Sequence, residues 1–281
     1  MKPFLKYPGG KAALAERILD TLDVREGTVL VEPFLGAGAV ALAALDRGAT
    51  VLASDLSLPL VRTWAGVLDY GPDVLAAIAD LEVLDLTDAV YRDIRATFNV
   101  GLYTPGHAAY AIYLNRACFN GLWRFNADGD FNVPWGKKSK VTVAESAKDT
   151  IKGLWAWKLA GMINVVWASA FEAVDDAPPG AVVYLDPPYV PSKRDPKRPA
   201  FTAYGVGSEP LWTFDDTLHL VDVVRDVGRR CVLSYSADPV LVQHLTATGW
   251  HVEHLDVKRT ISRDGDGRKP AREILASWDV K

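Results

Sequence analysis

Four consecutive residues, Asp186-Pro187-Pro188-Tyr189, carry the clearest chemical signal in the sequence. They follow the apolar run 181–185, which predicts a buried strand. Proline has no backbone N–H, so the turn presents carbonyl oxygens, while an ionised aspartate only accepts hydrogen bonds and tyrosine adds a flat ring. Such a socket suits a planar group that bears an amine, as a nucleobase does. An ordinary proline-rich turn at the end of a strand is the alternative.

A glycine-rich turn near the start of the chain predicts a binding site for a ligand that contains a nucleoside. The predicted strand 28–32 runs into it, and residues 36–41 fit the pattern G-x-G-x-x-G/A ahead of an apolar helix. Asp55 lies nineteen residues after Gly36, at the end of the next predicted strand, 50–54. A carboxylate at that position can accept hydrogen bonds from ribose hydroxyls.

Two ligand classes compete for this turn. An NAD-type dinucleotide fits the glycine spacing, but Glu32 and Phe34 put an acid and a ring at the rim, where a pyrophosphate is disfavoured. S-adenosyl-L-methionine has a ribose and an adenine but no phosphate, and its sulfonium and ammonium groups favour nearby acids. It is the better match, because the Asp-Pro-Pro-Tyr turn has no role in hydride transfer. A glycine turn without a ligand is the third alternative.

The composition indicates a folded globular protein of 281 residues, 49% of them hydrophobic. A net charge of −4 argues against a uniformly basic nucleic-acid binder, but basic residues cluster at 137–140, 193–198 and 258–272, as a phosphate-tracking groove requires. The two cysteines lack CxxC spacing and the histidines form no ligand pattern, so we expect no metal and a reduced, cytoplasmic compartment. The sequence shows no membrane span or signal peptide, so no membrane partner is expected.

The predicted elements divide the chain into a discontinuous core and an insert. Helical periodicity and then aromatic residues dominate 58–159, where Asp128-Gly129 predicts a hairpin with a tight primed turn. The core, 1–57 and 160–281, should form an α/β fold with a mixed sheet and helices on both faces, one of them capped by Thr213. Beyond the strands already given, strands are predicted at 163–167, 231–234, 251–257 and 274–278, the last two antiparallel.

Taken together, these motifs resemble the Dam-like, D12 class DNA adenine-N6 methyltransferases. The motifs occur in that family's order, with a recognition insert between the cofactor motifs and the catalytic turn, and they span nearly the whole chain. The order favours adenine N6 over the cytosine N4 type. The matching segments are Phe4–Lys11, 30–40, Asp55, 113–126, 129–134, 186–189, 201–204 and 258–262.

The resemblance implies a Rossmann-like, S-adenosyl-L-methionine-dependent methyltransferase fold. Catalysis would fall to Asp186, Pro187 and Tyr189. In the cofactor site, the methionine end would contact Tyr7 and Lys11, and Leu56 and Phe171 would sandwich the adenine, with a core aromatic as the alternative for Phe171. The implied cofactor residues are Tyr7, Lys11, Glu32, Phe34, Gly36, Gly38, Asp55, Leu56, Phe171 and Asp186.

Double-stranded DNA is the partner that the resemblance implies, bound by a monomeric, bacterial or phage-encoded enzyme. Arg124 would read a guanine, and Phe119 with Asn120 would refill the base stack after an adenine is flipped out. A core packer and a salt-bridge partner are the alternatives for Phe119 and Arg124. The implied DNA-binding residues are Lys6, Arg116, Phe119, Asn120, Arg124, Asn126, Pro134 and Lys138.

The sequence therefore predicts methyl transfer from S-adenosyl-L-methionine to N6 of a flipped-out adenine in duplex DNA, with GATC as the site that the resemblance suggests. Methylation of RNA or of another amine is one alternative, and a catalytically silent DNA-binding protein is another. The hairpin is a large device for a small substrate, and the intact Asp-Pro-Pro-Tyr turn argues against a silent protein. The proline- and charge-rich segment 191–200 is expected to be a mobile loop over the pocket.

Overall fold

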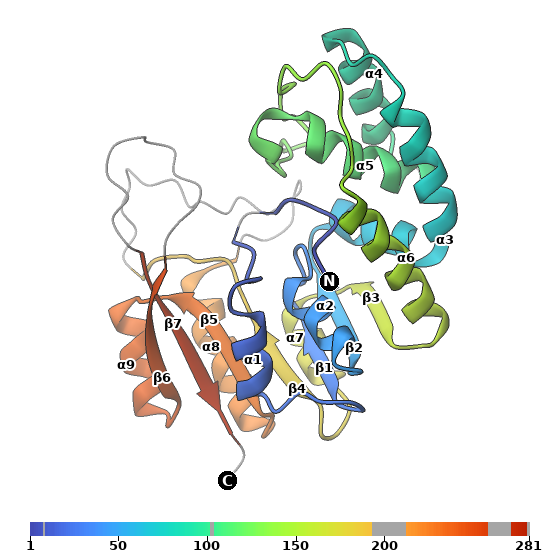
Figure 1. Cartoon of the computed structure of the whole chain (residues 1–281). Helices are drawn as coiled ribbons and strands as arrows, with labels where there is room; N and C mark the ends of the chain where they lie inside the picture. Colours follow the sequence, from blue (N-terminus) through green and yellow to red (C-terminus); the bar gives the residue numbers. More distant parts are fainter. Residues whose placement is uncertain (8, 102–103, 193–211, 258–270, 280–281) are drawn as a thin grey trace.

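The computed structural model describes residues 1–7, 9–101, 104–192, 212–257 and 271–279. Within them, a central sheet has the strand order β3-β2-β1-β4-β5-β7-β6 (Figure 1). β7 is antiparallel to both of its neighbours, and the other pairs of adjacent strands are parallel. The strands are β1 (Val29–Glu32), β2 (Thr50–Asp55), β3 (Ile163–Trp167), β4 (Val182–Leu185), β5 (Cys231–Ser236), β6 (His251–Val257) and β7 (Ala271–Trp278).

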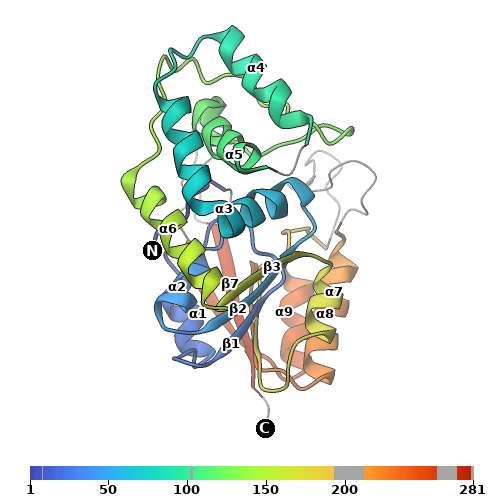
Figure 2. The same cartoon turned by 90° about the vertical axis from the view of Figure 1, so that its right-hand side faces the viewer.

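Helices cover both faces of this sheet (Figure 2). α1 and α2 lie on one face, and α7, α8 and α9 lie on the other. The helices are α1 (Ala15–Thr21), α2 (Ala39–Asp46), α3 (Leu58–Glu82), α4 (Asp88–Asn99), α5 (Pro105–Ala117), the 3-10 helix η1 (Phe119–Gly121), α6 (Glu145–Leu159), α7 (Ala170–Asp175), α8 (Phe214–Asp226) and α9 (Pro239–Ala247).

The predicted mixed α/β sheet is confirmed. Each predicted strand is present, with ends that differ by no more than three residues. The sequence pattern explains this success, because a parallel strand covered on both faces is apolar throughout. In β4, Val182 and Tyr184 pack on the α1–α2 side, while Val183 and Leu185 pack on the α7–α9 side. The helix predicted to start at Thr213 also begins there, with a reciprocal capping box to Asp216.

The order of the strands reverses between β1 and β4. From β1 the chain builds outward through β2 to β3, and β4 then starts the other half of the sheet with β5. The two strands pair through Leu30 with Val182 and Val31 with Val183. In open α/β sheets, ligands bind outside the carboxyl ends of the strands at such a reversal. The crevice between the ends of β1 and β4 is therefore the expected ligand site.

Helices α3 to α6 form a layer that extends beyond the sheet (Figure 1). α3 bends at Tyr70 (φ −134°, ψ 32°), two residues before Pro72, whose ring does not fit a continuous helix. One apolar cluster runs from Leu30 in the sheet to Ile112 in this layer, so the two parts share a core. The division of the chain at 58 and 160 stays a prediction.

The hairpin near Asp128 has a different turn from the predicted one. Asn126 donates its N–H to the Asp130 carbonyl (2.9 Å) and accepts the N–H of Gly129 (3.1 Å), so three residues, 127–129, form the loop. The type I′ turn that Asp-Gly favours needs positive φ at both central residues, whereas in this loop only Gly129 has it (85°). The Asn126 side chain stabilises the wider loop, because its Oδ1 accepts the N–H groups of Asp128 (3.1 Å) and Asp130 (2.7 Å).

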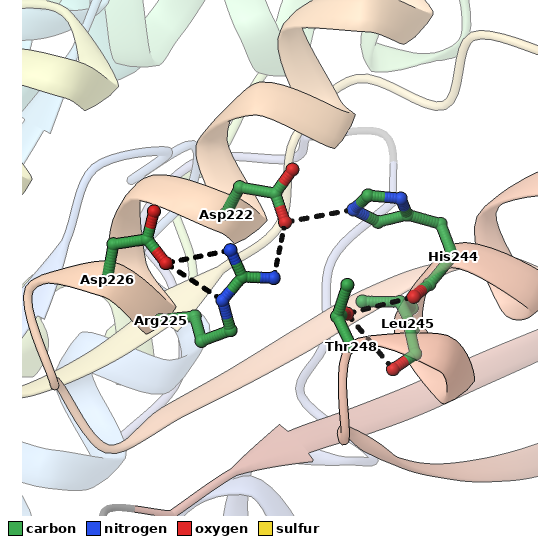
Figure 3. A network of polar contacts seen from close by, with 6 residues as sticks. All are labelled: Asp222, Arg225, Asp226, His244, Leu245 and Thr248. Atoms are coloured by element: carbon green, nitrogen blue, oxygen red, sulfur yellow. Dashed lines mark hydrogen bonds and ion pairs between the residues drawn. The ribbon is translucent and has the colours of Figure 1, made fainter.

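A polar network joins α8 to α9 on the outer side of the sheet (Figure 3). Asp222 Oδ1 lies 2.9 Å from Arg225 Nη1 and 3.0 Å from His244 Nε2. Arg225 also pairs with Asp226 (2.7 Å). These side chains are partly exposed, so each pair contributes no more than about 1 kcal/mol to stability.

Among the described residues, no helix is long and apolar enough to cross a membrane.

Candidate active site

Asp186, the first residue after β4, is the centre of a set of close polar contacts. Lys11 Nζ lies 2.8 Å from Oδ2 and also 2.8 Å from Oδ1. Ser234 Oγ donates to Oδ1 at 2.8 Å, and the Tyr189 hydroxyl is 3.4 Å from the same oxygen. The fold thus brings together three predicted residues, Lys11, Asp186 and Tyr189, and adds Ser234 from β5. Ionic hydrogen bonds of this length hold the carboxylate in one orientation.

Lys11 also contacts the ring of Tyr189 next to this carboxylate. Lys11 is 8% exposed, donates to the Gly9 carbonyl (2.9 Å) and places Nζ 5.0 Å from the centre of the Tyr189 ring. Burial, and next the charge of Asp186, raise the pKa of Tyr189 well above its ordinary value. Tyr189 therefore keeps its hydroxyl proton and presents a neutral ring, as a surface that stacks on a base requires.

Tyr235 on β5 fixes the chain directly after the Asp186–Tyr189 turn. Its hydroxyl donates to the Val190 carbonyl (2.8 Å) and accepts the Val190 N–H (2.7 Å). The rings of Tyr235 and Tyr189 pack with their centres 4.9 Å apart. The Tyr235 hydroxyl thus anchors the backbone just after the turn, which holds the segment that carries Asp186 and Tyr189 in place.

The glycine turn at the end of β1 is shaped by Trp64 of α3. Gly36 and Gly38 have positive φ (49° and 69°), which side chains other than glycine rarely adopt. A Cβ on Gly38 would lie 2.6 Å from the Trp64 ring, and one on Gly36 would lie 3.2 Å from the Tyr7 ring. Trp64 also donates its indole N–H to the Gly36 carbonyl (3.0 Å). Tyr7 therefore lies against the turn.

Two acids border the same turn, the partly buried Asp55 and the buried Glu32. Asp55 accepts the N–H of Gly36 (3.1 Å) and of Ser57 (2.9 Å), yet burial raises its pKa to about 6. Glu32 is 3% exposed, and its Oε2 has no hydrogen-bond partner among the described residues. Burial, and next the charge of Asp186, raise the pKa of Glu32 well above its ordinary value. A buried acceptor without a partner fits a ligand that brings hydroxyl or ammonium donors.

Three aromatic side chains pack together, one of them from the segment that leads into the glycine turn. Phe171 stacks on Trp212, with ring centres 5.9 Å apart and planes at 25°, and Phe34 meets Trp212 edge-on at 5.1 Å. Trp212 is a residue that the sequence reasoning missed; its position directly before a helix cap gave no functional signal. Leu56, the other predicted adenine contact, accepts the indole N–H of Trp167 at its carbonyl (2.9 Å).

A second group of predicted residues lies around η1, where buried Asn115 ties two segments together. Its side chain accepts the Lys6 N–H (2.7 Å) and donates to the carbonyls of Lys6 (2.9 Å) and Gly121 (3.2 Å). The Lys6 side chain is exposed. Burial, and next the charges of Lys138 and Arg116, lower the pKa of Lys6, which shows that these three cations share one electropositive region.

Phe119 and Asn120 project from this region. Phe119 is 52% exposed, so the alternative that it is a core packer is wrong. Asn120 has a positive φ (53°), and Phe119 donates its N–H to the carbonyl of the exposed Pro134 (2.9 Å). A hollow opens beside them, lined by Pro3, Leu5, Lys6, Tyr7, Gly10, Ala12, Ala37, Ala39, Asn120, Gly121 and Leu122.

The remaining predicted DNA contacts differ in how free they are. Arg124 is exposed and donates from Nε to Asn132 Oδ1 (2.8 Å), an amide in place of the acid that the alternative required. The Arg116 guanidinium donates to the Phe4 carbonyl (2.9 Å), and Lys138 Nζ donates to the Arg116 carbonyl. Asn126 is engaged in the hairpin turn described above. Residues 193–200 of the predicted loop, and the matches at 201–204 and 258–262, lie outside the described residues.

In the described parts of the chain, no group of His, Cys, Asp and Glu side chains could hold a metal ion.

Comparisons with known proteins give one consistent result. Residues 7–261 match the model of the D12 class N6 adenine-specific DNA methyltransferases. The DNA adenine methylase of Serratia marcescens is 32% identical over 99% of this chain and 98% of its own length, and that of Escherichia coli K12 is 31% identical over 99% and 95%. A type II methyltransferase of Methanocaldococcus jannaschii is 30% identical over 96% of both chains.

The substitution Asp55→Asn should change how stability depends on pH. A carboxyl whose pKa is raised to about 6 in the folded protein binds its proton more tightly than in the unfolded chain. Its contribution to stability is therefore full below about pH 4 and is lost as pH rises through about 6. Between these values, we expect the free energy of unfolding of wild type relative to Asp55→Asn to fall by roughly 1–2 kcal/mol, allowing for some solvent screening.

Urea titrations at a series of pH values and fixed ionic strength measure this difference. Glu32 and all other acids are common to both proteins, so their titration largely cancels in the comparison. Parallel pH profiles for the two proteins would show that Asp55 titrates normally.

Proposed function

The chain belongs to the D12 class N6 adenine-specific DNA methyltransferase family and is an adenine-specific DNA methyltransferase, and we propose that S-adenosylmethionine is its methyl donor, bound in the crevice between β1 and β4. The observation that carries this proposal is the set of contacts around Asp186. It combines an amine-accepting carboxylate and an aromatic face at the position where the fold expects its ligand.

The residues around the crevice fit this cofactor in three parts. Asp55 would accept hydrogen bonds from the ribose hydroxyls. Glu32 Oε2, which has no partner among the described residues, would accept a hydrogen bond from another donor of the cofactor. The Gly36–Gly38 turn lets the backbone approach closely. Tyr7 and Lys11 would lie at the methionine end. We assign the adenine to Leu56, Phe34 and Phe171, with Trp212 as an added aromatic wall.

When bound, the cofactor supplies a methyl group on a positively charged sulfur, which an amine displaces in line. The adenine amine is a weak nucleophile, because its lone pair is delocalised into the ring. Asp186 and the Pro187 carbonyl would accept its two N–H groups and turn the lone pair toward the methyl group. The negative carboxylate also stabilises the positive charge that develops on nitrogen. Tyr189 would stack on the base.

Asp186 has acceptor capacity left for this task. An ionised carboxylate offers about four acceptor positions. Lys11, Ser234 and Tyr189 are the groups within hydrogen-bonding distance of its oxygens in the described structure. Oδ1 contacts all three groups, whereas Oδ2 contacts Lys11 alone among them, so Oδ2 is the oxygen that an adenine amine would approach while Ser234 stays in place.

The adenine must leave the DNA double helix before it can react, because N6 cannot be reached inside a stacked duplex. We propose that Phe119 and Asn120 fill the space that the adenine leaves in the base stack. Both side chains are exposed, which supports a role as a wedge. Residues 58–159 would form the DNA-recognition domain, with Arg124 reading a guanine and Pro134 near a thymine methyl. Asn126 would orient the hairpin. Lys6, Arg116 and Lys138 would add positive potential toward phosphates.

We extend the proposal to a monomeric enzyme that acts in the cytoplasm of a bacterial cell and recognises GATC. The support for GATC is the match of Arg124 and Pro134 to the family's hairpin, together with analogy to that family.

The substitution Asp186→Ala should abolish methyl transfer to duplex DNA. Loss of the acceptor removes both orientation of the amine and stabilisation of its developing charge, so we expect a fall in kcat of at least about a thousandfold. Transfer of a labelled methyl group to duplex DNA measures the rate. Calorimetry with S-adenosylmethionine shows whether cofactor binding survives. Unchanged transfer by this variant would contradict the proposed mechanism.

The substitution Arg124→Ala should relax sequence preference with less effect on the fold. A bidentate arginine–guanine contact discriminates by about 1–3 kcal/mol, so we expect methylation of near-cognate sites to rise relative to the cognate site by roughly 10- to 100-fold. Methylation-sensitive long-read sequencing of DNA from cells that express each variant measures this ratio. Lys137→Ala, which removes an exposed cation nearby, is the control. An unchanged ratio for Arg124→Ala would refute its role as the reader.

A further inference from the structure

Ser234 lies directly opposite Asp186 across the β4–β5 pair. Leu185 pairs with Leu233 in the parallel register, so the next residues on the two strands are neighbours at the carboxyl edge. Ser234 is 1% exposed, and its Oγ is 2.8 Å from Asp186 Oδ1. A buried serine within an apolar strand usually has no functional role, but this one contacts the central carboxylate.

Tyr184 continues the contact on the other side of Ser234. Its hydroxyl oxygen lies 2.8 Å from Ser234 Oγ, and its side chain is 1% exposed. An ionised carboxylate cannot donate, so Ser234 must give its one hydroxyl proton to Asp186. Ser234 Oγ then accepts the proton of Tyr184. Burial, and next the charge of Asp186, raise the pKa of Tyr184 well above its ordinary value, so this proton stays in place.

Lys11 and Ser234 hold the Asp186 carboxylate from two different parts of the chain. Lys11 Nζ is 2.8 Å from both oxygens, and Ser234 donates to Oδ1 from the neighbouring strand β5. Lys11 lies in an irregular segment near the start of the chain, whereas Ser234 and Tyr184 lie in strands of the sheet. Of these partners, the two hydroxyls are the ones that fix the carboxylate relative to the sheet.

We propose that Ser234, oriented by Tyr184, is a positioning residue for methyl transfer, which sets the plane of the Asp186 carboxylate for the incoming adenine amine. The inference rests on the proposed role of Asp186. Acceptor geometry matters here, because a hydrogen bond weakens steeply when its angle is poor. Rotation of the carboxylate would misplace the amine lone pair without closing either binding site.

Ser234→Ala is the direct test, and Ser54→Ala is its matched control. Ser54 ends an equivalent apolar run on β2 and is also 1% exposed, but its Oγ has no hydrogen-bond partner among the described residues. We expect Ser234→Ala to lower kcat by about 10- to 100-fold, as for loss of a hydrogen bond to a charged group. KM for DNA and Kd for S-adenosylmethionine should stay within about threefold. Ser54→Ala should match wild type in all three.

Two further variants keep the test informative if Ser234→Ala does not fold. Ser234→Cys replaces the hydroxyl with a weak donor of similar shape, and should give a kcat between those of wild type and Ser234→Ala. Tyr184→Phe leaves the Ser234–Asp186 bond in place, and should lower kcat by only a few-fold.

The outcomes separate this inference from the proposed function. If Ser234→Ala and Ser234→Cys keep the wild-type kcat while Asp186→Ala is inactive, Ser234 has no positioning role and the proposed function stands. If kcat falls only together with cofactor affinity and the urea midpoint, the role of Ser234 is structural and the inference is overturned. If Asp186→Ala itself is fully active, the proposed function fails first.

Discussion

The main physical constraint on this structure is the charged carboxylate of Asp186 at the end of a buried strand. β4 is buried along its whole length, and Asp186 follows it without a break. A charge in that position is costly unless cations and hydroxyls compensate it. Lys11 comes from the first turn of the chain, Ser234 from β5 and Tyr189 from the turn itself. The sheet order that places β1 and β5 on either side of β4 is what lets these groups meet.

The same constraint explains the chemical character of the crevice. Glu32, Asp55 and Asp186 border one site, and burial raises the pKa of the first two. Three acids at one site, one buried and two partly buried, disfavour phosphate and favour a ligand with positive charge and hydroxyl donors. This agrees with a methyl donor that carries a sulfonium group, and not with a dinucleotide. The family match supports the same choice by an independent route.

Much of the fold could be predicted because inner strands such as β4 are continuous apolar runs and the helix at Thr213 has a local capping signal. Local patterns could not reveal Asn115 or Ser234. Asn115 bonds residues 109 positions away, and Ser234 bonds a residue 48 positions away, so each has meaning only after the chain has folded. The hairpin turn was mispredicted because the Asp128-Gly129 signal ignored the side chain of Asn126, which stabilises a longer loop.

We propose that the site at Asp186 methylates adenine at N6 in duplex DNA with S-adenosylmethionine as the donor. Mass spectrometry of nucleosides tests this, after the purified chain has reacted with S-adenosylmethionine and unmethylated duplex DNA. The expected methylated nucleoside is N6-methyladenine. Formation of N4-methylcytosine instead, or methylation of RNA with none of the duplex, would contradict it.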